Sequence, residues 1–221
     1  MRRLPALFLL LALTACRAVS TTAAPAEGTA AASTVNSAAV RGDPGRVGYG
    51  TALAPREGTA LAAFSAGCFW GVEDAFRHVP GVVASAVGYT GGHTDAPTYA
   101  SVCRHTTGHA ETVLVEFDPG VVSYETLLNV FFKNHDPTTK DSQGPDVGDQ
   151  YRSAIFTLSP AQDAAARAAK IRETATRKHE VVTEIGPLQR FWKAEEYHQQ
   201  YDEKTGSHSC PMPQGLPTQG T

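Results

Sequence analysis

Apolar residues recur along this chain in short runs and in stripes, and the two patterns predict different elements. Short apolar runs bounded by turn residues are typical of buried strands, and apolar residues three and four positions apart are typical of one helix face. The predicted strands cover residues 61–64, 82–89, 110–117, 153–158 and 181–185. The predicted helices begin after Cys68, at Ser123 and at Pro160, and the last two run to about residues 135 and 179. Because strands and helices are mixed without strict alternation, we expect an α+β fold rather than a doubly wound sheet.

Polar residues mark the starts of two of these helices. Ser123 can cap one of them, and Ser159 is followed by a proline at the first helical position and by Gln162, which predicts a capping box. An Asp-Pro pair at 136–137 ends the helix that starts at Ser123. The polar, glycine-bearing segment 138–150 is the kind of long loop in which binding groups lie.

The two ends of the chain differ in composition from its middle. A basic start and an apolar run over 4–13, too short for a permanent membrane span, predict that residues 1–15 are an export signal. Residues 16–48 are rich in Ala, Thr and Ser, so we expect a flexible tether. Residues 49–205 are long enough to form one domain with its own core, and 206–221 form a tail of small, polar and proline residues.

Cys16 follows Leu13, Thr14 and Ala15 directly after the apolar run. This ending resembles the lipobox of bacterial lipoprotein signal peptides, in which the cysteine is lipidated and becomes the first residue of the mature chain. The resemblance implies a lipid anchor at Cys16 and a location in the bacterial cell envelope, facing the periplasm or the exterior. The alternative is an ordinary secretory signal in which Cys16 is incidental.

Charge and cysteine usage exclude several functions. The net charge is −3 and the basic residues are scattered, so we expect no binding to nucleic acid. The four cysteines form neither a C-x-x-C pair nor a zinc-ligand spacing, so we expect no metal. Without Cys16 three cysteines remain, so at least one thiol is unpaired or takes part in exchange. Cys103, in a segment that we interpret as strand or loop, is expected to be a bystander.

Cys68 lies where the first predicted strand ends and a helix with Val72 and Phe76 on one face begins. A helix N-terminus offers unpaired N–H groups and a positive partial charge, which favour a thiolate over a thiol. Cys68 is therefore a candidate nucleophile, and the neighbouring Phe69 and Trp70 indicate an apolar pocket. The alternative is that Cys68 is a small buried hydrophobic residue, the common role of a free cysteine.

Glu111 lies in the predicted strand 110–117, where it shares a face with Val113, Val115 and Phe117. We expect that face to be buried, and burial would raise the pKa of the carboxyl group and keep it protonated near neutrality. A protonated carboxyl group in a cleft can act as a general acid. The alternative places Glu111 at the solvent edge of the sheet, with an unperturbed carboxyl group.

Four short motifs occur in order along the chain. They are residues 67–71 (Gly-Cys-Phe-Trp-Gly), 108–111 (Gly-His-Ala-Glu), 134–137 (Asn-His-Asp-Pro) and 150–153 (Gln-Tyr-Arg-Ser). Together they resemble the A-type peptide-methionine sulfoxide reductases, which reduce the S epimer of methionine sulfoxide. The resemblance covers about residues 60–210 and implies a ferredoxin-like α/β sandwich with extended coil segments.

The resemblance also implies a role for each matching site residue. These are Cys68 as the nucleophile, Glu111 as the acid, Phe69 and Trp70 around the substrate methyl group, Tyr99 and Tyr151 as ligands of the sulfoxide oxygen, Asp146 as an assisting carboxylate and Cys210 as the resolving cysteine.

These residue types suit the reaction. A sulfoxide sulfur becomes electrophilic when its oxygen receives a proton or a strong hydrogen bond, which a carboxyl group and two tyrosines can supply while the Cys68 thiolate attacks. Release of the thioether leaves Cys68 as a sulfenic acid, with which Cys210 would form a disulfide. We expect no bound cofactor and an external dithiol, such as a thioredoxin-like protein, as the reductant. Because the tail holds only one cysteine, this dithiol would attack the Cys68–Cys210 bond directly.

Three alternative functions stay open. A Cys–His hydrolase would activate Cys68 with His109 or His198 and would not need Cys210. A thiol peroxidase would resolve its sulfenic acid through Cys210 but needs neither a methyl pocket nor a buried acid. A non-catalytic envelope lipoprotein that binds oxidised peptides would tolerate loss of Cys68. For the reductase, the expected partners are oxidised methionine-containing proteins or peptides, a thioredoxin-like reductant and, through Cys16, a membrane. We expect a monomer.

Overall fold

The computed structural model describes residues 55–207 and the backbone of two short strands before them. The predicted signal at 1–15, most of the predicted tether at 16–48 and the tail from residue 208 lie outside the described residues. The elements, in chain order, are β1 (Arg46–Val47), β2 (Thr51–Ala52), β3 (Ala60–Ala66), α1 (Phe69–Arg77), β4 (Val82–Thr90), α2 (Tyr99–Val102), β5 (Ala110–Phe117), α3 (Tyr124–Lys133), β6 (Ser142–Gln143), β7 (Asp146–Val147), η2 (Asp149–Tyr151), β8 (Ser153–Thr157), α4 (Pro160–Thr176), β9 (Glu184–Pro187), β10 (Trp192–Lys193), η3 (Glu196–His198) and α5 (Tyr201–Thr205).

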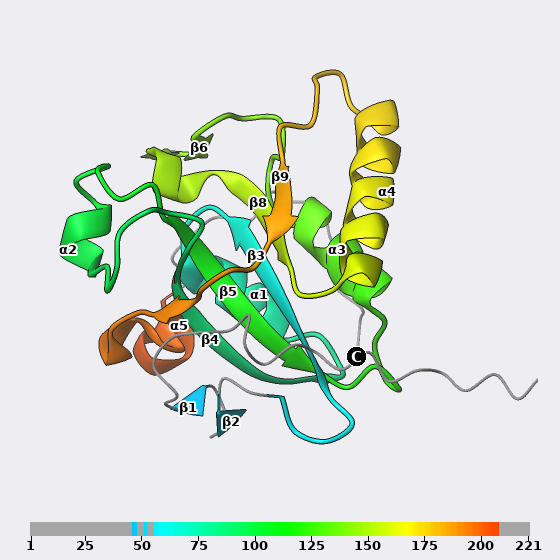
Figure 1. Ribbon diagram of the computed structural model, residues 1–221, viewed down its shortest axis with the longest axis horizontal. Helices are drawn as coiled ribbons and strands as arrows, with labels where there is room; N and C mark the ends of the chain where they lie inside the picture. The colour runs from blue at the N-terminus through cyan, green and yellow to red at the C-terminus, as the bar shows by residue number, and fades with distance from the viewer. Residues whose placement is uncertain (1–45, 48–50, 53–54, 208–221) are drawn as a thin grey trace, which may run out of the picture. The chain divides into compact units, whose positions relative to one another are not determined.

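The central sheet has six strands in the order β10-β4-β5-β3-β8-β9 (Figure 1). Neighbouring strands are antiparallel, except that β9 runs parallel to β8. The path β3-α1-β4-β5-α3-β8 has the β-α-β-β-α-β order of the ferredoxin-like fold, and β10 and β9 extend its two edges. The expected α+β, ferredoxin-like fold is confirmed. No helix in the described part of the chain is long and apolar enough to cross a bilayer.

Helices and coil cover different faces of this sheet. On one face α1, α3 and α4 pack against the strands, and Phe64 of β3 stacks on Phe76 and Phe131 with ring centroids 4.8 and 5.5 Å apart. On the other face the strands present many alanines, and the coil between β9 and β10 packs there through Leu188 and Phe191. The small side chains leave room for this coil to cross the sheet.

The helices end earlier than their apolar periodicity predicts. Helix α3 ends at Lys133, because the ring Nδ1 of His135 takes the place of a backbone N–H and lies 2.7 Å from the Phe131 carbonyl oxygen. Helix α4 ends at Thr176, where Arg177 becomes extended and its guanidinium donates to a carbonyl oxygen of α3 at 2.8 Å.

The predicted cap of α4 is half right. Ser159 Oγ accepts the Gln162 N–H at 3.2 Å, as an N-cap residue should. However, Gln162 Oε1 accepts from the Leu158 N–H rather than from Ser159, and its Nε2 donates to the Leu61 carbonyl oxygen at 2.7 Å. The capping box is therefore wrong, because the buried amide of Gln162 ties α4 to β3 instead.

The last predicted strand is displaced. Strand β9 covers Glu184–Pro187, whereas the apolar run predicts a strand over 181–185. Val181 is fully buried, Val182 N–H donates to the Pro137 carbonyl oxygen at 2.8 Å, and Thr183 Oγ1 lies 2.8 Å from Ser153 Oγ. The pattern at 181–183 thus reflects burial of Val181 and Thr183 rather than strand pairing, which begins only at Glu184.

Candidate active site

Cys68 lies between the end of β3 and the start of α1, as the sequence predicts. It is the N-cap residue of α1, with φ −55° and ψ 119°, its side chain makes no capping hydrogen bond, and it is half-buried. Gly67 makes the turn before it, because its φ of +98° lies where only glycine is comfortable. The structure therefore gives Cys68 the helix-terminal environment that lowers a thiol pKa in general.

Glu111 is buried beside the same helix start. It is 2% exposed and lies opposite Tyr89 in the β4–β5 pairing, on the face covered by α1. The backbone N–H of Phe69 donates to Glu111 Oε2 at 3.0 Å. The alternative that Glu111 lies at the solvent edge is therefore wrong, and its carboxyl group lies against the residue that follows Cys68.

Phe69 and Trp70 form an aromatic wall with residues from the end of the domain. Trp70 Nε1 donates to His198 Nδ1 at 3.0 Å, and the Trp70 ring stacks on Tyr201 with centroids 3.8 Å apart. The His198 ring lies 5.1 Å from Phe69 and 4.7 Å from Tyr99. The Trp70 indole is thus contacted by His198 at its N–H edge and by Tyr201 on its face.

Tyr99 and Tyr151 come from two different coil regions. Tyr99 begins the short helix α2, and its backbone N–H donates to Glu195 Oε1 at 2.9 Å. Burial raises the pKa of Tyr99, and the neighbouring Cys103 thiol and then Glu111 raise it further. Burial also raises the pKa of Tyr151, which ends η2, and its next largest contribution comes from Glu111. Both phenols therefore stay protonated hydrogen-bond donors, and Glu111 contributes to the raised pKa of each.

Asp146 lies on the short β6–β7 hairpin in the long polar loop. Burial raises the pKa of Asp146, and its charge contributes in turn to the raised pKa of Tyr151. A Cβ on Gly67 would lie 2.7 Å from Gln143 Cγ, so the absent side chain lets this hairpin approach the Cys68 turn closely. The structure thus brings Cys68, Glu111 and Asp146 to one region.

Two of the predicted functional cysteines, Cys16 and Cys210, lie outside the described residues. Cys103 is the C-cap residue in the turn that follows α2, so the loop alternative holds at this position, although the two residues before it are helical. Its thiol is free and half-buried, and it neighbours the hydroxyl group of Tyr99. The role of Cys103 stays a prediction.

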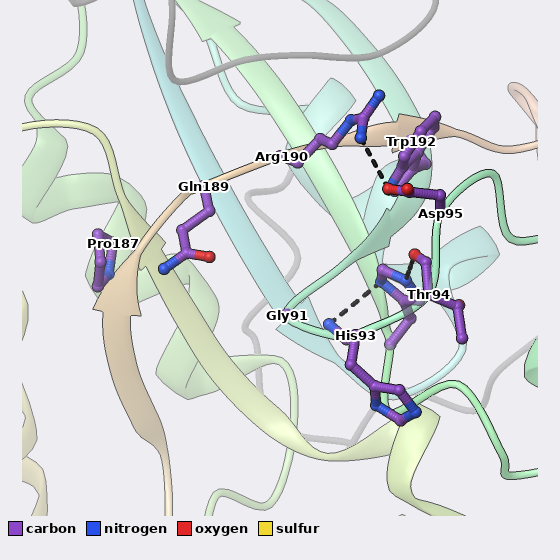
Figure 2. A pocket seen from close by; sticks show the side chains of 10 residues that line it. Gly91, His93, Thr94, Asp95, Pro187, Gln189, Arg190 and Trp192 are labelled. Atoms are coloured by element: carbon purple, nitrogen blue, oxygen red, sulfur yellow. Dashed lines mark hydrogen bonds and ion pairs between the residues drawn. The ribbon is translucent and has the colours of Figure 1, made fainter.

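A separate polar cavity of about 380 Å³ lies between the loop after β4 and the coil before β10 (Figure 2). Arg190 Nη1 donates to Asp95 at 2.8 Å, and its guanidinium lies 3.7 Å from the Trp192 ring centroid. His109 lines this cavity with both ring nitrogens engaged: Nδ1 accepts the Gly92 N–H and Nε2 lies 2.8 Å from a backbone oxygen. Apart from His109, the candidate base of the hydrolase alternative, none of the predicted site residues is among the described residues that line it.

The contacts of His109 and His198 do not favour the Cys–His hydrolase alternative. Both nitrogens of His109 are bound to the backbone, and His198 uses Nδ1 to accept from Trp70. Burial lowers the pKa of His109 and of His198, which disfavours the imidazolium of a Cys–His ion pair. Within the described residues, no group of three or more His, Cys, Asp or Glu side chains is placed to hold a metal ion.

The segment at 195–201 contributes to the site in a way that the sequence did not predict. His198 entered only as the base of a rival mechanism, and Glu195 and Tyr201 did not enter at all. Glu195 accepts from the Tyr99 N–H and, at 3.1 Å, from the Tyr89 hydroxyl group. One sequence feature could have indicated this contribution. Residues 196–201 (Glu-Tyr-His-Gln-Gln-Tyr) combine polar and aromatic side chains in a segment without regular periodicity.

Comparisons with known proteins agree with this geometry. Residues 60–219 match the family model of peptide methionine sulfoxide reductase. A relative from Methanosarcina mazei, peptide methionine sulfoxide reductase MsrA, is 61% identical over 154 residues, which cover 69% of this chain and 73% of the relative. The MsrA of Geobacter sulfurreducens is 55% identical over 158 residues, or 70% of this chain and 98% of the relative.

Solved structures are similar as well. Methionine sulfoxide reductase A of Corynebacterium diphtheriae matches with a TM-score of 0.69 and 35% identity, over 80% of this chain and 92% of its own. Reduced Mxr1 from Saccharomyces cerevisiae matches with a TM-score of 0.67 and 36% identity, over 70% and 91% of the two chains. The chain therefore belongs to the peptide methionine sulfoxide reductase family and is an enzyme of the MsrA type, a thiol-dependent reductase of the S epimer of methionine sulfoxide.

Proposed function

We propose that Cys68 is the nucleophile of this reductase and that Glu111 protonates the sulfoxide oxygen during the attack. The observation that carries the proposal is that both side chains lie at the start of α1. Cys68 is its N-cap residue, and Glu111 Oε2 accepts the N–H of the next residue at 3.0 Å. A nucleophile and a proton donor on either side of one peptide group can reach the sulfur and the oxygen of the same sulfoxide.

The remaining site residues complete the reaction. Phe69 and Trp70 receive the S-methyl group, and the hydroxyl groups of Tyr99 and Tyr151 donate hydrogen bonds to the sulfoxide oxygen. Their raised pKa values support this role, because a phenol that resists ionisation remains a donor. The Cys68 thiol gains the sulfoxide oxygen and becomes a sulfenic acid, and the substrate leaves as a thioether.

Cys210 then resolves the sulfenic acid. Its thiol attacks Cys68 sulfur, water leaves, and a Cys68–Cys210 disulfide forms. The position of Cys210, three residues after Ser207 in a tail of small residues, supports this role. A thioredoxin-like dithiol reduces the disulfide by thiol–disulfide exchange, and oxidised methionine residues of proteins or peptides are the substrates.

The site is tested by a single turnover without external thiol. We expect wild type to convert one equivalent of the S epimer, none of the R epimer, and to form a disulfide between Cys68 and Cys210. Cys68→Ser should form no methionine. Cys210→Ser should form one equivalent and leave a sulfenic acid that dimedone traps, whereas Cys103→Ser, the matched control, should behave as wild type. A disulfide that persists in Cys210→Ser and disappears in Cys103→Ser would assign the resolving role to Cys103.

We also propose that the chain is anchored in the bacterial cell envelope by lipid at Cys16. Support comes from the apolar run followed by Leu-Thr-Ala-Cys, and two or more acyl chains would hold the domain stably at a membrane. Full-length protein expressed in a bacterium should incorporate labelled palmitate and sediment with membranes, and Cys16→Ala should do neither. Wild-type protein without label would contradict the anchor.

A further inference from the structure

Glu73 is a buried carboxylate in α1, one turn after Trp70. It is 1% exposed and lies at the centre of a hydrogen-bonded cluster. Its Oε1 accepts from Ser85 Oγ at 2.7 Å and from Gln200 Nε2 at 2.8 Å, and its Oε2 accepts the Gln200 backbone N–H at 2.7 Å. Burying a carboxylate is costly unless it is hydrogen-bonded, and here two of these three donors belong to one residue far along the chain.

The segment 198–201, which Glu73 holds, contacts the indole of Trp70 from two directions. His198 Nδ1 accepts the indole N–H at 3.0 Å, and Tyr201 stacks on the indole with an interplanar angle of 11°. Between them, the Gln199 amide group accepts from the Val87 N–H and donates to the Val87 carbonyl oxygen, both at 2.9 Å, which attaches the segment to β4. The position of the indole therefore depends on the conformation of these four residues.

Gln200 holds the unusual conformation in this segment. Its φ and ψ are +49° and +44°, in the left-handed region that non-glycine residues seldom adopt. Such a conformation persists only when the surroundings fix it. Glu73 binds both the backbone N–H and the side chain of Gln200, so it stabilises the left-handed turn that lies between His198 and Tyr201.

The same face of α1 carries a second link to α5. Arg77, one turn beyond Glu73, forms two hydrogen bonds with the Glu203 carboxylate at 2.7 and 2.8 Å, and its Nη1 donates to Ser85 Oγ at 3.2 Å. Residues 70, 73 and 77 thus form one stripe that α5 and the residues before it cover. Within this stripe, Glu73 is the residue bonded directly to the left-handed turn.

We propose that Glu73 is a positioning residue for substrate binding: it fixes the turn at Gln200 so that His198 and Tyr201 hold Trp70 in the orientation that receives the S-methyl group. The effect on substrate rests on the proposed role of Trp70 in the methyl pocket, whereas the effect on the indole does not. Glu73 itself touches neither substrate nor thiol.

The experiment uses the fluorescence of Trp70. The chain has two tryptophans, so Trp192→Phe leaves Trp70 as the single reporter in the full chain. In that background we would compare Glu73→Gln, Gln200→Gly and the double variant. Glu116→Gln is the matched control, because Glu116 is also fully buried on the sheet and accepts from Arg56 and Thr59, five residues along β5 from Glu111. Emission, acrylamide quenching, KM and kcat would be measured for each.

We expect Glu73→Gln to shift Trp70 emission to longer wavelength and to raise KM about tenfold with kcat within about twofold, as for loss of a binding contact. Gln200→Gly keeps the backbone donor, suits the left-handed turn and should shift both quantities less. The two effects should be non-additive in the double variant, because both substitutions alter the contact between the Glu73 carboxylate and the Gln200 side chain. Glu116→Gln should leave emission and KM as in the parent.

Unchanged emission in Glu73→Gln, or a change no larger than that of Glu116→Gln, would overturn the positioning role. If Glu73→Gln does not fold, Glu73→Asp, which shortens the side chain and withdraws the carboxylate from Gln200, carries the test, and unchanged emission in that variant would overturn the role equally. An emission shift without a change in KM would support the positioning of the indole and overturn the place of Trp70 in the methyl pocket.

Discussion

The indole N–H of Trp70 donates to Nδ1 of His198, 3.0 Å away and 128 residues further along the chain. This contact requires the neutral imidazole with its proton on Nε2. Burial lowers the pKa of His198, which favours that neutral form at pH 7. The N–H edge of the Trp70 indole is therefore fixed by a ring nitrogen of a residue near the end of the domain sequence.

Replacing His198 tests this contact. His198→Leu removes the acceptor and should raise KM for methionine sulfoxide about tenfold, the effect of one lost hydrogen bond in a buried site. His198→Asn offers an oxygen near the position of Nδ1 and should lie closer to wild type. Steady-state kinetics with the S epimer give both values. Equal KM values for the two variants would show that the acceptor does not matter.

Glu111→Gln tests the proposed acid. The substitution keeps the size of the side chain and an oxygen that can accept the Phe69 N–H, but it cannot supply the proton. We expect kcat to fall by a factor of about 10² to 10⁴, the usual contribution of general acid catalysis, and the melting temperature to change little. Glu116→Gln controls for the loss of a buried carboxylate on the same strand. A kcat near that of wild type would remove Glu111 from the mechanism.

Gly67→Ala tests the close approach of the β6–β7 hairpin. Gly67 has φ +98°, and an added Cβ would lie 2.7 Å from Gln143 Cγ. Gly58 has a similar φ of +82°, and a Cβ added there would meet nothing within 4 Å, so Gly58→Ala isolates the backbone cost. Both variants should lose about 1 kcal/mol of unfolding free energy from left-handed strain. Only Gly67→Ala should also lower kcat/KM, because it displaces the hairpin that carries Asp146.

His135 predicts how stability depends on pH. Burial lowers its pKa to about 4, and its Nδ1 and Nε2 lie 2.7 Å from the Phe131 carbonyl oxygen and from Ser153 Oγ. The unfolded chain, with an imidazole pKa near 6.5, binds more protons than the folded chain between the two values. Unfolding free energy should therefore fall as the pH is lowered from about 6.5 to 4, by roughly 3 kcal/mol from this residue.

Denaturant titrations across that range, for wild type and His135→Gln, measure this contribution. The variant cannot be protonated at this position, so the difference in stability between the two proteins should shrink as the pH falls. Parallel curves for the two proteins would show that the buried imidazole does not contribute to acid sensitivity.

The sequence by itself determined the strands and helices that depend on the local order of apolar and polar residues. It also determined the site residues whose positions follow from those strands and helices. The apolar runs predicted strands at β3, β4, β5 and β8, because a strand buried on both faces has few polar residues. Cys68 was placed at a helix start by the switch from an apolar run to helical spacing. Glu111 was placed on a buried face because side chains alternate along a strand.

The tertiary structure alone decided the contacts between distant segments. Residues 181–183 resemble a strand in sequence, yet their hydrogen bonds go to the Pro137 carbonyl oxygen and the Ser153 side chain rather than to the backbone of a neighbouring strand, because burial and strand pairing have the same local pattern. Gln162 binds Leu61 rather than its own cap because packing brings β3 within reach. The hydrogen bonds between Trp70 and His198 and between Glu73 and Gln200 each join residues more than 120 positions apart in the sequence. The periodicity of apolar residues cannot predict such pairs, because each pair depends on how α1, β4 and the last coil pack together.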